Sequence, residues 1–489
     1  MAKKVMIIGT GLGGLTTGLR LAKLGYSVEM IEKYHQPGGR LNQLKKDGFT
    51  FDTGPTFFSM SYEFRSFAGD CGIDMPFEFV ELDPLYSVSF SGRDKYYLVY
   101  KDIDKLAAEF ADEPFFKERV NRYLDDAGRF FHATEYPVVK RNFYSLFSYA
   151  AALAQVPLSH SPKLFRSYWR HVGKYFSSYE AKVIFSLVAF FLGSTPFETS
   201  AVFSLLNYTE LKHDGYYNVK GGMYKIVEGM LHELQKCGVA IHYNTEIVDF
   251  IEKNNRISSF VDQYNKRWEA DQYVVNADAA SFRGSVLRRK KFSEEKLDKM
   301  KWTMAPFCLY LGVKGKIDAI HHHNYFLGTD FTQYAQSVFS KWDVSRRPYY
   351  YVNVPSKHNP NTAPGGCESL FVLYPVADLR YKPSWDDRER VAMNLISDLS
   401  EKTRYDIKSN LLSMTILDPA NWRDAFNLYK GSGLGLAHNM AQLAYFRPSN
   451  KDEKLKNLYY VGASTVPGTG LPMVTISSKL VVERIMHDN

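Results

Sequence analysis

Strand, glycine-turn and helix patterns follow one another at both ends of the chain. The apolar run Val5–Ile8 is typical of a buried parallel strand, and the segment after it predicts a helix that ends at Gly25. Ser27–Ile31 predicts the next strand, and Leu458–Arg484 predicts a strand, a glycine turn and a final helix. This alternation predicts an α/β fold in which both ends of the polypeptide contribute to one site.

The middle of the chain repeats this pattern. An amphipathic helix is predicted over Tyr224–Lys236, with its end at Gly238. The segments Val239–Tyr243, Glu246–Glu252 and Asp271–Asp278 predict strands. We therefore expect the chain to return here to the domain that its N-terminus begins.

Length, charge and cysteine content narrow the class of protein. A chain of 489 residues suggests roughly two to four structural units. The net charge of +8 gives no case for nucleic acid, and the four scattered cysteines form no CxxC pair, which argues against zinc and disulfides and suits a reducing cytosolic setting. The longest nearly apolar run, Val183–Gly193, is about half the roughly twenty residues of a spanning helix, so we expect no membrane crossing.

A dinucleotide-binding motif lies between the first strand and the first helix. Gly9, Gly11 and Gly14 form G-x-G-x-x-G, which permits a tight turn, close approach to a pyrophosphate and close packing of the helix. The helix N-terminus supplies free N–H groups for the phosphates. Glu32, 23 positions after Gly9, can accept hydrogen bonds from ribose hydroxyls and disfavours NADP. The other positions assigned to this surface are Leu12, Gly13 and Lys33.

Two further turns favour FAD over a simple NAD cofactor. Pro37–Arg40 reads PGGR and Phe51–Thr56 reads FDTGPT, a continuation typical of FAD enzymes related to amine oxidases. The candidate cofactor contacts in these turns are Gly39, Arg40, Gly54, Pro55 and Thr56.

The middle and C-terminal blocks complete the candidate flavin site. Val248 is expected to contact the adenine side through its backbone, and Asn276 stands where a strand turns. Gly462 ends the last strand, and Pro467–Gly470 predicts a turn before the final helix. The N-terminus of that helix can hold negative charge on a reduced flavin ring. The remaining candidate contacts are Ala463, Leu471, Pro472, Met473 and Val474.

Three longer segments carry a family resemblance. They are Val354–Pro364 (VPSKHNPNTAP), Asn427–Pro448 (NLYKGSGLGLAHNMAQLAYFRP) and Leu458–Met473 (LYYVGASTVPGTGLPM). Together with PGGR, FDTGPT and YNVKGGM, they resemble the bacterial-type carotenoid desaturases, the phytoene desaturase family, over nearly the whole chain. The chain departs from the usual family residues at His358–Asn359, where Thr-Asp is usual, and at Val466, where His or a polar residue is usual.

The resemblance implies FAD, a linear or monocyclic C40 carotenoid substrate and the introduction of C=C bonds. It also implies a cytoplasmic protein that is peripheral on the inner face of the cell membrane. Adjacent carbons of the substrate would lose a hydride to the flavin and a proton, whose loss is eased because the cation is allylic. The protein would align the substrate and exclude water, so no catalytic side chain is assigned. A quinone or oxygen would accept the electrons, and the sequence leaves that choice open.

Residues 136–179 contain no Asp or Glu and predict a membrane-facing helical cap. Basic residues interleaved with aromatic residues suit the headgroup boundary of an anionic membrane. A helical cap whose basic face is simply solvated would have the same sequence pattern. The basic residues are Lys140, Arg141, Lys163, Arg166, Arg170 and Lys174. The aromatic residues are Phe143, Tyr144, Phe147, Tyr149, Phe165, Tyr168, Trp169, Tyr175 and Phe176.

Other functions stay open on the sequence. A carotenoid isomerase or saturase, an FAD-dependent amine oxidase, and a non-enzymatic prenyl-lipid-binding protein such as a Rab GDP-dissociation inhibitor are the alternatives. The intact glycine motif and Glu32 argue against the last of these. No metal is expected at His321–His323, because adjacent histidines in an extended segment point to alternate sides and no carboxylate or cysteine cluster accompanies them.

The predicted architecture is an α/β fold with a discontinuous Rossmann-like FAD-binding domain. That domain comprises residues 1–90, 215–285 and 430–489. A mixed-sheet substrate domain comprises 91–135 and 286–429, and the helical membrane-facing cap spans 136–214. A tunnel between the mixed sheet and the cap is expected to lead to the flavin.

Overall fold

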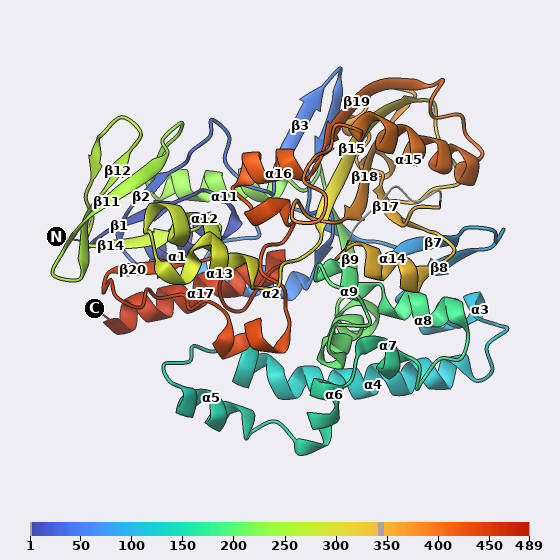
Figure 1. Cartoon of the computed structure of the whole chain (residues 1–489), viewed down its shortest axis with the longest axis horizontal. Helices are drawn as coiled ribbons and strands as arrows, with labels where there is room; N and C mark the ends of the chain where they lie inside the picture. The colour runs from blue at the N-terminus through green and yellow to red at the C-terminus, as the bar shows by residue number, and fades with distance from the viewer. Residues whose placement is uncertain (1, 341–346, 489) are drawn as a thin grey trace.

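A parallel sheet forms one end of the molecule, where both termini lie (Figure 1). The computed structural model describes residues 2–340 and 347–488. Within them this sheet has five strands in the order β10-β2-β1-β14-β20, and every neighbouring pair is parallel. Adjacent strands therefore come from the start, middle and end of the chain, which confirms the predicted α/β class. The strands are β1 (Lys4–Ile8), β2 (Ser27–Ile31), β10 (Ala240–His242), β14 (Gln272–Val275) and β20 (Leu458–Tyr460).

The two faces of this sheet have different partners. Alternate side chains of a strand point to opposite faces, so Val5 and Ile7 pack with the helices, whereas Met6 and Ile8 pack with a small antiparallel sheet. Helix α1 packs against α11 and α17, and α17 also contacts α2. The helices are α1 (Leu12–Lys23), α2 (Ser61–Cys71), α11 (Lys225–Lys236) and α17 (Leu471–Asp488). The small sheet comprises β11 (Ile247–Lys253), β12 (Arg256–Asp262) and β13 (Arg267–Trp268).

A second, mixed sheet forms the other half of the molecule. Within the described ranges it has seven strands in the order β19-β15-β18-β17-β16-β7-β8, antiparallel throughout except where β16 meets β7. Helix α15 (Arg388–Thr403) adds Val391 and Leu395 to its core. The strands are β7 (Tyr86–Phe90), β8 (Tyr96–Val99), β15 (Ala305–Lys314), β16 (His323–Leu327), β17 (Tyr350–Asn353), β18 (Cys367–Val376) and β19 (Leu411–Leu417).

Short strands connect the two halves. The first FAD-binding segment was expected to extend to residue 90, but β7 already pairs with β16 in the mixed sheet. The chain therefore leaves the first half before Tyr86. The connecting strands are β3 (Gln43–Lys46), β4 (Phe49–Asp52), β5 (Phe58–Ser59), β6 (Phe79–Glu81) and β9 (Tyr216–Val219).

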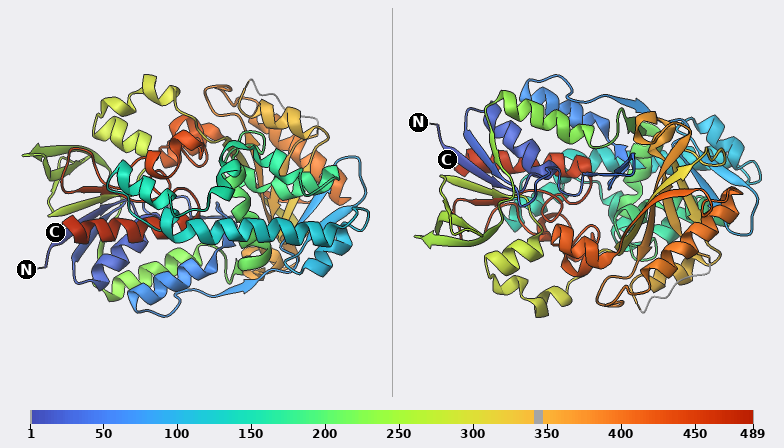
Figure 2. Two further views of the ribbon diagram at one scale, coloured as in Figure 1. Left: turned by 90° about the horizontal axis from the view of Figure 1, so that it is seen from below. Right: turned by 90° about the horizontal axis from the view of Figure 1, so that it is seen from above.

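A layer of helices covers one side of both halves. The long helix α4 runs across this side, as the view from below shows (Figure 2). Helices α5 and α6 lie outermost (Figure 1). The cap therefore includes α4, which was expected in the substrate domain of residues 91–135. Its helices include α4 (Phe116–Thr134), α5 (Leu146–Leu153), η2 (Leu158–His160), α6 (Ser161–Phe165), α7 (Tyr168–Val172), α8 (Tyr179–Ser186), α9 (Val188–Phe191) and α10 (Leu205–Tyr208).

The basic and aromatic residues of 136–179 divide into buried and exposed groups. Lys140 Nζ lies 2.7 Å from Glu135 Oε1, and Lys163 Nζ lies 2.8 Å from Asp126 Oδ2; both lysines are largely buried. These two lysines therefore do not face a headgroup layer, contrary to the expectation. Their acidic partners stand outside the segment, where a count over 136–179 does not include them. Tyr168 and Phe176 lie in the core.

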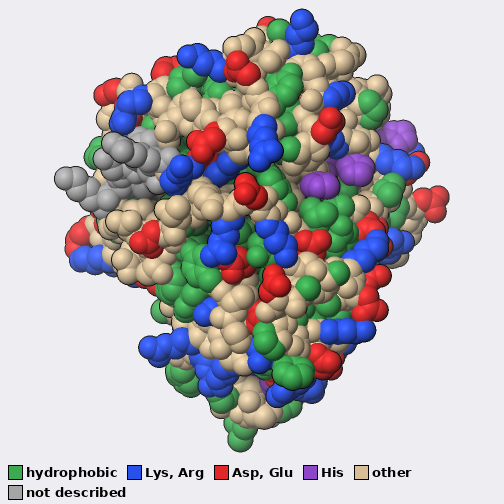
Figure 3. Space-filling model, turned by 90° about the vertical axis from the view of Figure 1, so that its right-hand side faces the viewer, with side chains coloured by type: hydrophobic (Ala, Val, Ile, Leu, Met, Phe, Trp, Pro, Cys, Tyr) green, Lys and Arg blue, Asp and Glu red, His purple; other side chains and the backbone are tan. Residues whose placement is uncertain are grey.

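Three large apolar side chains of the cap protrude instead. Phe147, Leu158 and Phe165 are 83%, 86% and 91% exposed. Hydrophobic and basic side chains gather at the narrow lower end of the face in Figure 3. Among the described residues, no helix is both long and apolar enough to cross a bilayer.

Gly312 fixes how closely β4 packs on the mixed sheet. A Cβ on Gly312 would lie 2.4 Å from Phe49 Cε2. We expect Gly312→Ala to lower the free energy of unfolding by about 1–3 kcal/mol, because the overpacked core has to shift. Denaturant unfolding followed by circular dichroism measures this change.

The matched control is Gly365→Ala, in an exposed loop where an added Cβ meets no atom within 4 Å. Its unfolding midpoint should equal that of the unsubstituted protein. Equal midpoints for the two variants would contradict the prediction.

Candidate active site

A large cavity extends from the edge of the parallel sheet to the cap. Its volume is about 1700 Å³ and most of its lining is apolar. A pocket for one small ligand typically measures about 300–1,000 Å³. The cavity therefore has room for a cofactor together with a second, long ligand.

Glycines at the ends of β1 and β20 converge on Asn276 and form what we call the glycine cradle. A Cβ on Gly9 would lie 2.6 Å from the backbone oxygen of Asn276, and one on Gly11 would lie 2.8 Å from Asn276 Nδ2. A Cβ on Gly13 or Gly462 would lie 2.7 Å from Asn276 Oδ1. Gly9 and Gly462 also adopt φ angles of 95° and 105°, which favour glycine. No other residue type fits these positions without moving Asn276.

Most of the predicted cofactor contacts meet at this end of the cavity. Gly14 does not line it: a Cβ there would lie 2.1 Å from Gly9 O, so Gly14 serves the close packing of α1 under the turn. Val248 is 43% exposed and lies outside the lining, where Glu246 and Ile247 take part instead. The predicted residues that do line the cavity are Gly9, Gly11, Leu12, Gly13, Glu32, Lys33, Gly39, Arg40, Gly54, Pro55, Thr56, Asn276, Gly462, Ala463, Leu471, Pro472, Met473 and Val474.

Glu32 is held in place by its neighbours while keeping acceptor capacity. The backbone N–H and the hydroxyl of Thr10 donate to Glu32 Oε2 at 2.8 and 2.6 Å. The N–H of Tyr34 donates to Glu32 Oε1 at 3.0 Å. A carboxylate has about four acceptor positions, so Glu32 can still accept from ribose hydroxyls.

A half-buried arginine and a half-buried aspartate stand beside the cradle. Arg40 Nη1 donates to Gly433 O at 2.9 Å. Burial lowers the pKa of Arg40, and the charge of Asp278 opposes this shift. Burial likewise raises the pKa of Asp278, against the hydrogen bond that its Oδ2 accepts from Ser464 Oγ at 2.9 Å. Arg40 therefore brings positive charge into the lining of the cavity.

Arg447 organises the loop between β20 and α17 and was not among the predicted residues. Its guanidinium donates to Ala463 O at 2.7 Å and to Thr465 O at 3.1 Å. Burial lowers the pKa of Arg447 to about 10. A single arginine in the otherwise apolar segment AYFRP is the sequence feature that could have identified it.

These residues fit an FAD molecule. The glycine cradle leaves backbone space for a pyrophosphate at the N-terminus of α1, and Glu32 lines the same cavity with acceptor positions free for ribose hydroxyls. The first turn of α17 lines the same cavity, so the positive end of its dipole can stabilise negative charge on a flavin ring.

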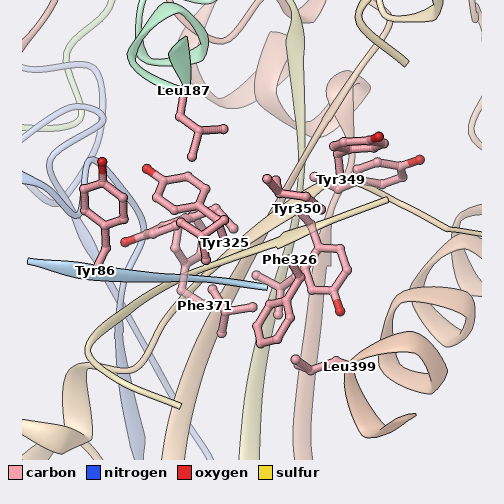
Figure 4. Close-up of a cluster of buried hydrophobic side chains, with 14 of the residues drawn as sticks. Tyr86, Leu187, Tyr325, Phe326, Tyr349, Tyr350, Phe371 and Leu399 are labelled. Atoms are coloured by element: carbon pink, nitrogen blue, oxygen red, sulfur yellow. The ribbon is translucent and has the colours of Figure 1, made fainter. Parts of the chain in front are cut away.

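Aromatic side chains from the mixed sheet line the inner part of the cavity. This aromatic wall faces the cap, and Leu187 of the cap points toward Tyr325 (Figure 4). Such a surface suits a long unsaturated chain, because aromatic rings offer large flat apolar faces for it to pack on. The wall comprises Tyr325, Tyr349, Tyr350, Tyr351 and Phe371.

The histidine triplet leads into the mixed sheet. His323 begins β16, and both His322 and His323 are buried. Throughout the described part of the chain, no cluster of three His, Cys, Asp or Glu side chains could hold a metal ion.

Comparisons with known proteins agree with this geometry. Residues 12–486 match the family model described as flavin containing amine oxidoreductase. The chain is 31% identical to the zeta-carotene-forming phytoene desaturase of Myxococcus xanthus, over 99% of this chain and 94% of the relative. It is 28% identical to a carotenoid 3,4-desaturase of Haloarcula japonica, over 99% and 98% of the two chains.

Solved structures share the fold at low identity. A putrescine oxidase variant superposes with a TM-score of 0.66 at 13% identity, over 100% of both chains. An oxidoreductase from Methanosarcina mazei gives a TM-score of 0.64 at 17% identity, over 98% and 100%. The chain belongs to the flavin-containing amine oxidoreductase family and, within it, to the FAD-dependent carotenoid desaturases.

Proposed function

We propose that this enzyme introduces C=C bonds into a linear or monocyclic C40 carotenoid. The substrate is phytoene or a later γ-carotene-type or hydroxylated intermediate. The observation that supports this proposal is the continuous cavity of about 1700 Å³, which leads from the glycine cradle past the aromatic wall to the cap. The curated relatives, which are named as desaturases of phytoene and other carotenoids, support the same substrate class.

The residues of the chain bind and orient in this proposal. The parallel-sheet half holds FAD through the glycine cradle, Glu32, Arg40 and the first turn of α17. The mixed sheet and the cap enclose the polyene, align it and exclude water. Bound FAD supplies the acceptor for the hydride, and a quinone or oxygen reoxidises it.

We also propose that the cap docks on the inner face of the cell membrane. Phe147, Leu158 and Phe165 protrude, and burying each in lipid contributes about 1.5–3 kcal/mol. Leu158 also lines the cavity, so the protruding surface adjoins the cavity. A carotenoid dissolved in the bilayer would therefore enter without crossing water.

Exposed basic residues supplement this apolar contact. Arg141, Arg170 and Lys174 are exposed, unlike Lys140 and Lys163. A basic residue near an anionic surface contributes about 1 kcal/mol. The cap would therefore prefer membranes that contain anionic lipid.

The product profile tests the function. Purified enzyme with FAD, an added quinone and anionic liposomes is given phytoene, γ-carotene and a 1-hydroxycarotenoid in parallel. We expect one of them to lose two mass units per C=C bond with a red-shifted absorbance. Isomerisation, saturation or amine turnover with peroxide release, in place of desaturation, would contradict the proposal.

Glu32→Gln tests the assigned FAD contact. Losing hydrogen bonds to a charged acceptor costs about 1.5–3 kcal/mol, so the Kd for FAD should rise by roughly ten- to a hundredfold. Flavin fluorescence titration of the apoprotein measures the Kd. Glu29→Gln, on the strand β2 that ends just before Glu32, is the control, because Glu29 pairs with Lys4 and does not line the cavity. Equal affinities for the Glu32 and Glu29 variants would refute the contact.

Substituting Phe147, Leu158 and Phe165 together by Ser tests the membrane face. We expect sedimentation with anionic liposomes to fall at least about tenfold, because several kcal/mol of apolar transfer are lost. Tyr264→Ser, an exposed aromatic in the turn after β12, is the control and should sediment normally. Unchanged sedimentation of the triple variant would argue against this face.

A further inference from the structure

Polar groups lead out of the aromatic wall of the cavity into the protein. Tyr351 lines the cavity, and its hydroxyl lies 2.9 Å from Thr56 Oγ1 and 2.6 Å from His323 Nδ1. Thr56 belongs to the FDTGPT turn, which is assigned to the flavin. The cavity-facing end of this hydrogen-bonded set is therefore next to a turn that we assign to the flavin.

Three histidine rings continue from Tyr351 toward the surface. The ring centroids of His323 and His322 are 4.5 Å apart, and those of His322 and His358 are 5.1 Å apart. His323 is fully buried, whereas His358 is exposed. Among the described residues, His323 Nε2 has no hydrogen-bond partner. A histidine that only filled the core would be expected to satisfy this nitrogen.

A small polar cavity lies next to these rings. Its volume is about 10 Å³, and its lining includes Asp52, Thr56, His322 and Asn353. This volume is close to the about 10–15 Å³ that one buried water molecule needs. Because Thr56 lines both cavities, a water molecule here would link the large cavity to His322.

The protonation states suit proton transfer. Burial lowers the pKa of His322 to about 3, with a further contribution from His358. Burial also holds the pKa of His323 far below its usual value. Both rings are therefore neutral near neutral pH, and a neutral imidazole can accept a proton on one nitrogen and donate from the other.

Other titratable groups around the rings do not block this path. Burial raises the pKa of Asp52 to about 6, against hydrogen bonds from the N–H groups of Met223 and Tyr224. Lys357 Nζ lies 3.0 Å from Glu368 Oε1, which offsets its charge. The remaining titratable groups include His321, whose pKa burial lowers, Tyr217, which lines the small cavity, and Tyr325, whose ring centroid lies 5.4 Å from that of Tyr351 and whose pKa burial raises.

We propose that Tyr351, His323, His322 and His358 form a relay that carries the proton of each desaturation to solvent. This inference rests on the proposed function. Two C–H bonds on adjacent carbons break: one hydrogen leaves with its electron pair as hydride, and the other leaves as a proton while its electron pair becomes the π bond. A bound FAD would supply the acceptor for the hydride, so one turnover would need no other oxidant.

The proton then moves outward by successive transfers. Tyr351 accepts it as the hydroxyl passes its own proton to His323 Nδ1. His323 passes a proton to His322 through water, because His323 Nε2 has no hydrogen-bond partner among the described residues, and His358 releases one to bulk water. His358 stands where the resembling family usually has Thr, so the outer end of this relay is a feature of this chain.

Single-turnover kinetics test the relay in the holoenzyme with anionic liposomes and phytoene. We expect His358→Ala to lower the rate of product formation by roughly tenfold, less than the about 10²–10⁴ of direct acid–base catalysis, because water can partly replace an exposed group. The half-saturating phytoene concentration should not change. Imidazole in the buffer should restore the rate of His358→Ala but not that of Tyr351→Phe.

His321→Ala is the matched control, because His321 belongs to the same histidine triplet but has no part in the relay. Its reaction rate should equal that of the unsubstituted enzyme, and imidazole should not change that rate. An unchanged rate in His358→Ala would overturn the relay. So would imidazole raising the rates of His358→Ala and Tyr351→Phe by the same factor.

Deuterium exchange at the C2 position of each histidine ring, read by mass spectrometry without substrate, tests the path independently of activity. Water access should make His322 exchange several-fold faster than His171, which is at least as buried and whose pKa burial lowers to about 4. Thr56→Val should slow the exchange of His322. Exchange as slow as that of His171 would refute the path. If His322 exchanges fast but the enzyme converts no carotenoid, the proposed function is refuted and the path for water is not.

Discussion

The packing of glycine backbones against Asn276 is the constraint on which the active site depends. Four glycines from the first and last strand–helix turns approach this residue more closely than a Cβ would allow. The contact joins the start, the middle and the end of the chain at the carboxyl edge of the parallel sheet. A cofactor site made from segments more than 450 residues apart exists only while these backbones touch, since side chains at the same positions would fill the space for a pyrophosphate.

The sequence predicted most of this half of the molecule because its determinants are local. Ser27–Ile31 is observed as predicted, and the helix expected over Tyr224–Lys236 begins one residue later. Glycine spacing and strand hydrophobicity are visible in a few consecutive residues. Arg447 was missed because its partners are backbone carbonyl groups in other loops, such as Ala463 O. Partners of this kind become visible only when the loops are placed in space.

The surface charge of the cap was also hard to predict from local sequence. A run of residues without Asp or Glu indicates local excess positive charge, but Lys140 and Lys163 find carboxylates at Glu63, Glu135 and Asp126. Moving a lysine out of water is costly unless an anion compensates its charge. These two lysines therefore stabilise the cap through buried ion pairs and do not form part of a basic surface. What remains outside is more apolar than the sequence suggested, because Leu158 and Phe165 occupy the outermost turns.

An apolar cavity that aligns a polyene creates a difficulty for its own chemistry. The same exclusion of water that protects a delocalised cation removes the solvent that would take up the proton. Strong bases in the wall would be expensive to bury in charged form and would shift their own pKa values. Neutral groups that accept and donate in turn avoid this cost, because no net charge resides in the wall between turnovers. The position of Tyr351, facing the cavity on one side and His323 on the other, is where such a solution would be placed.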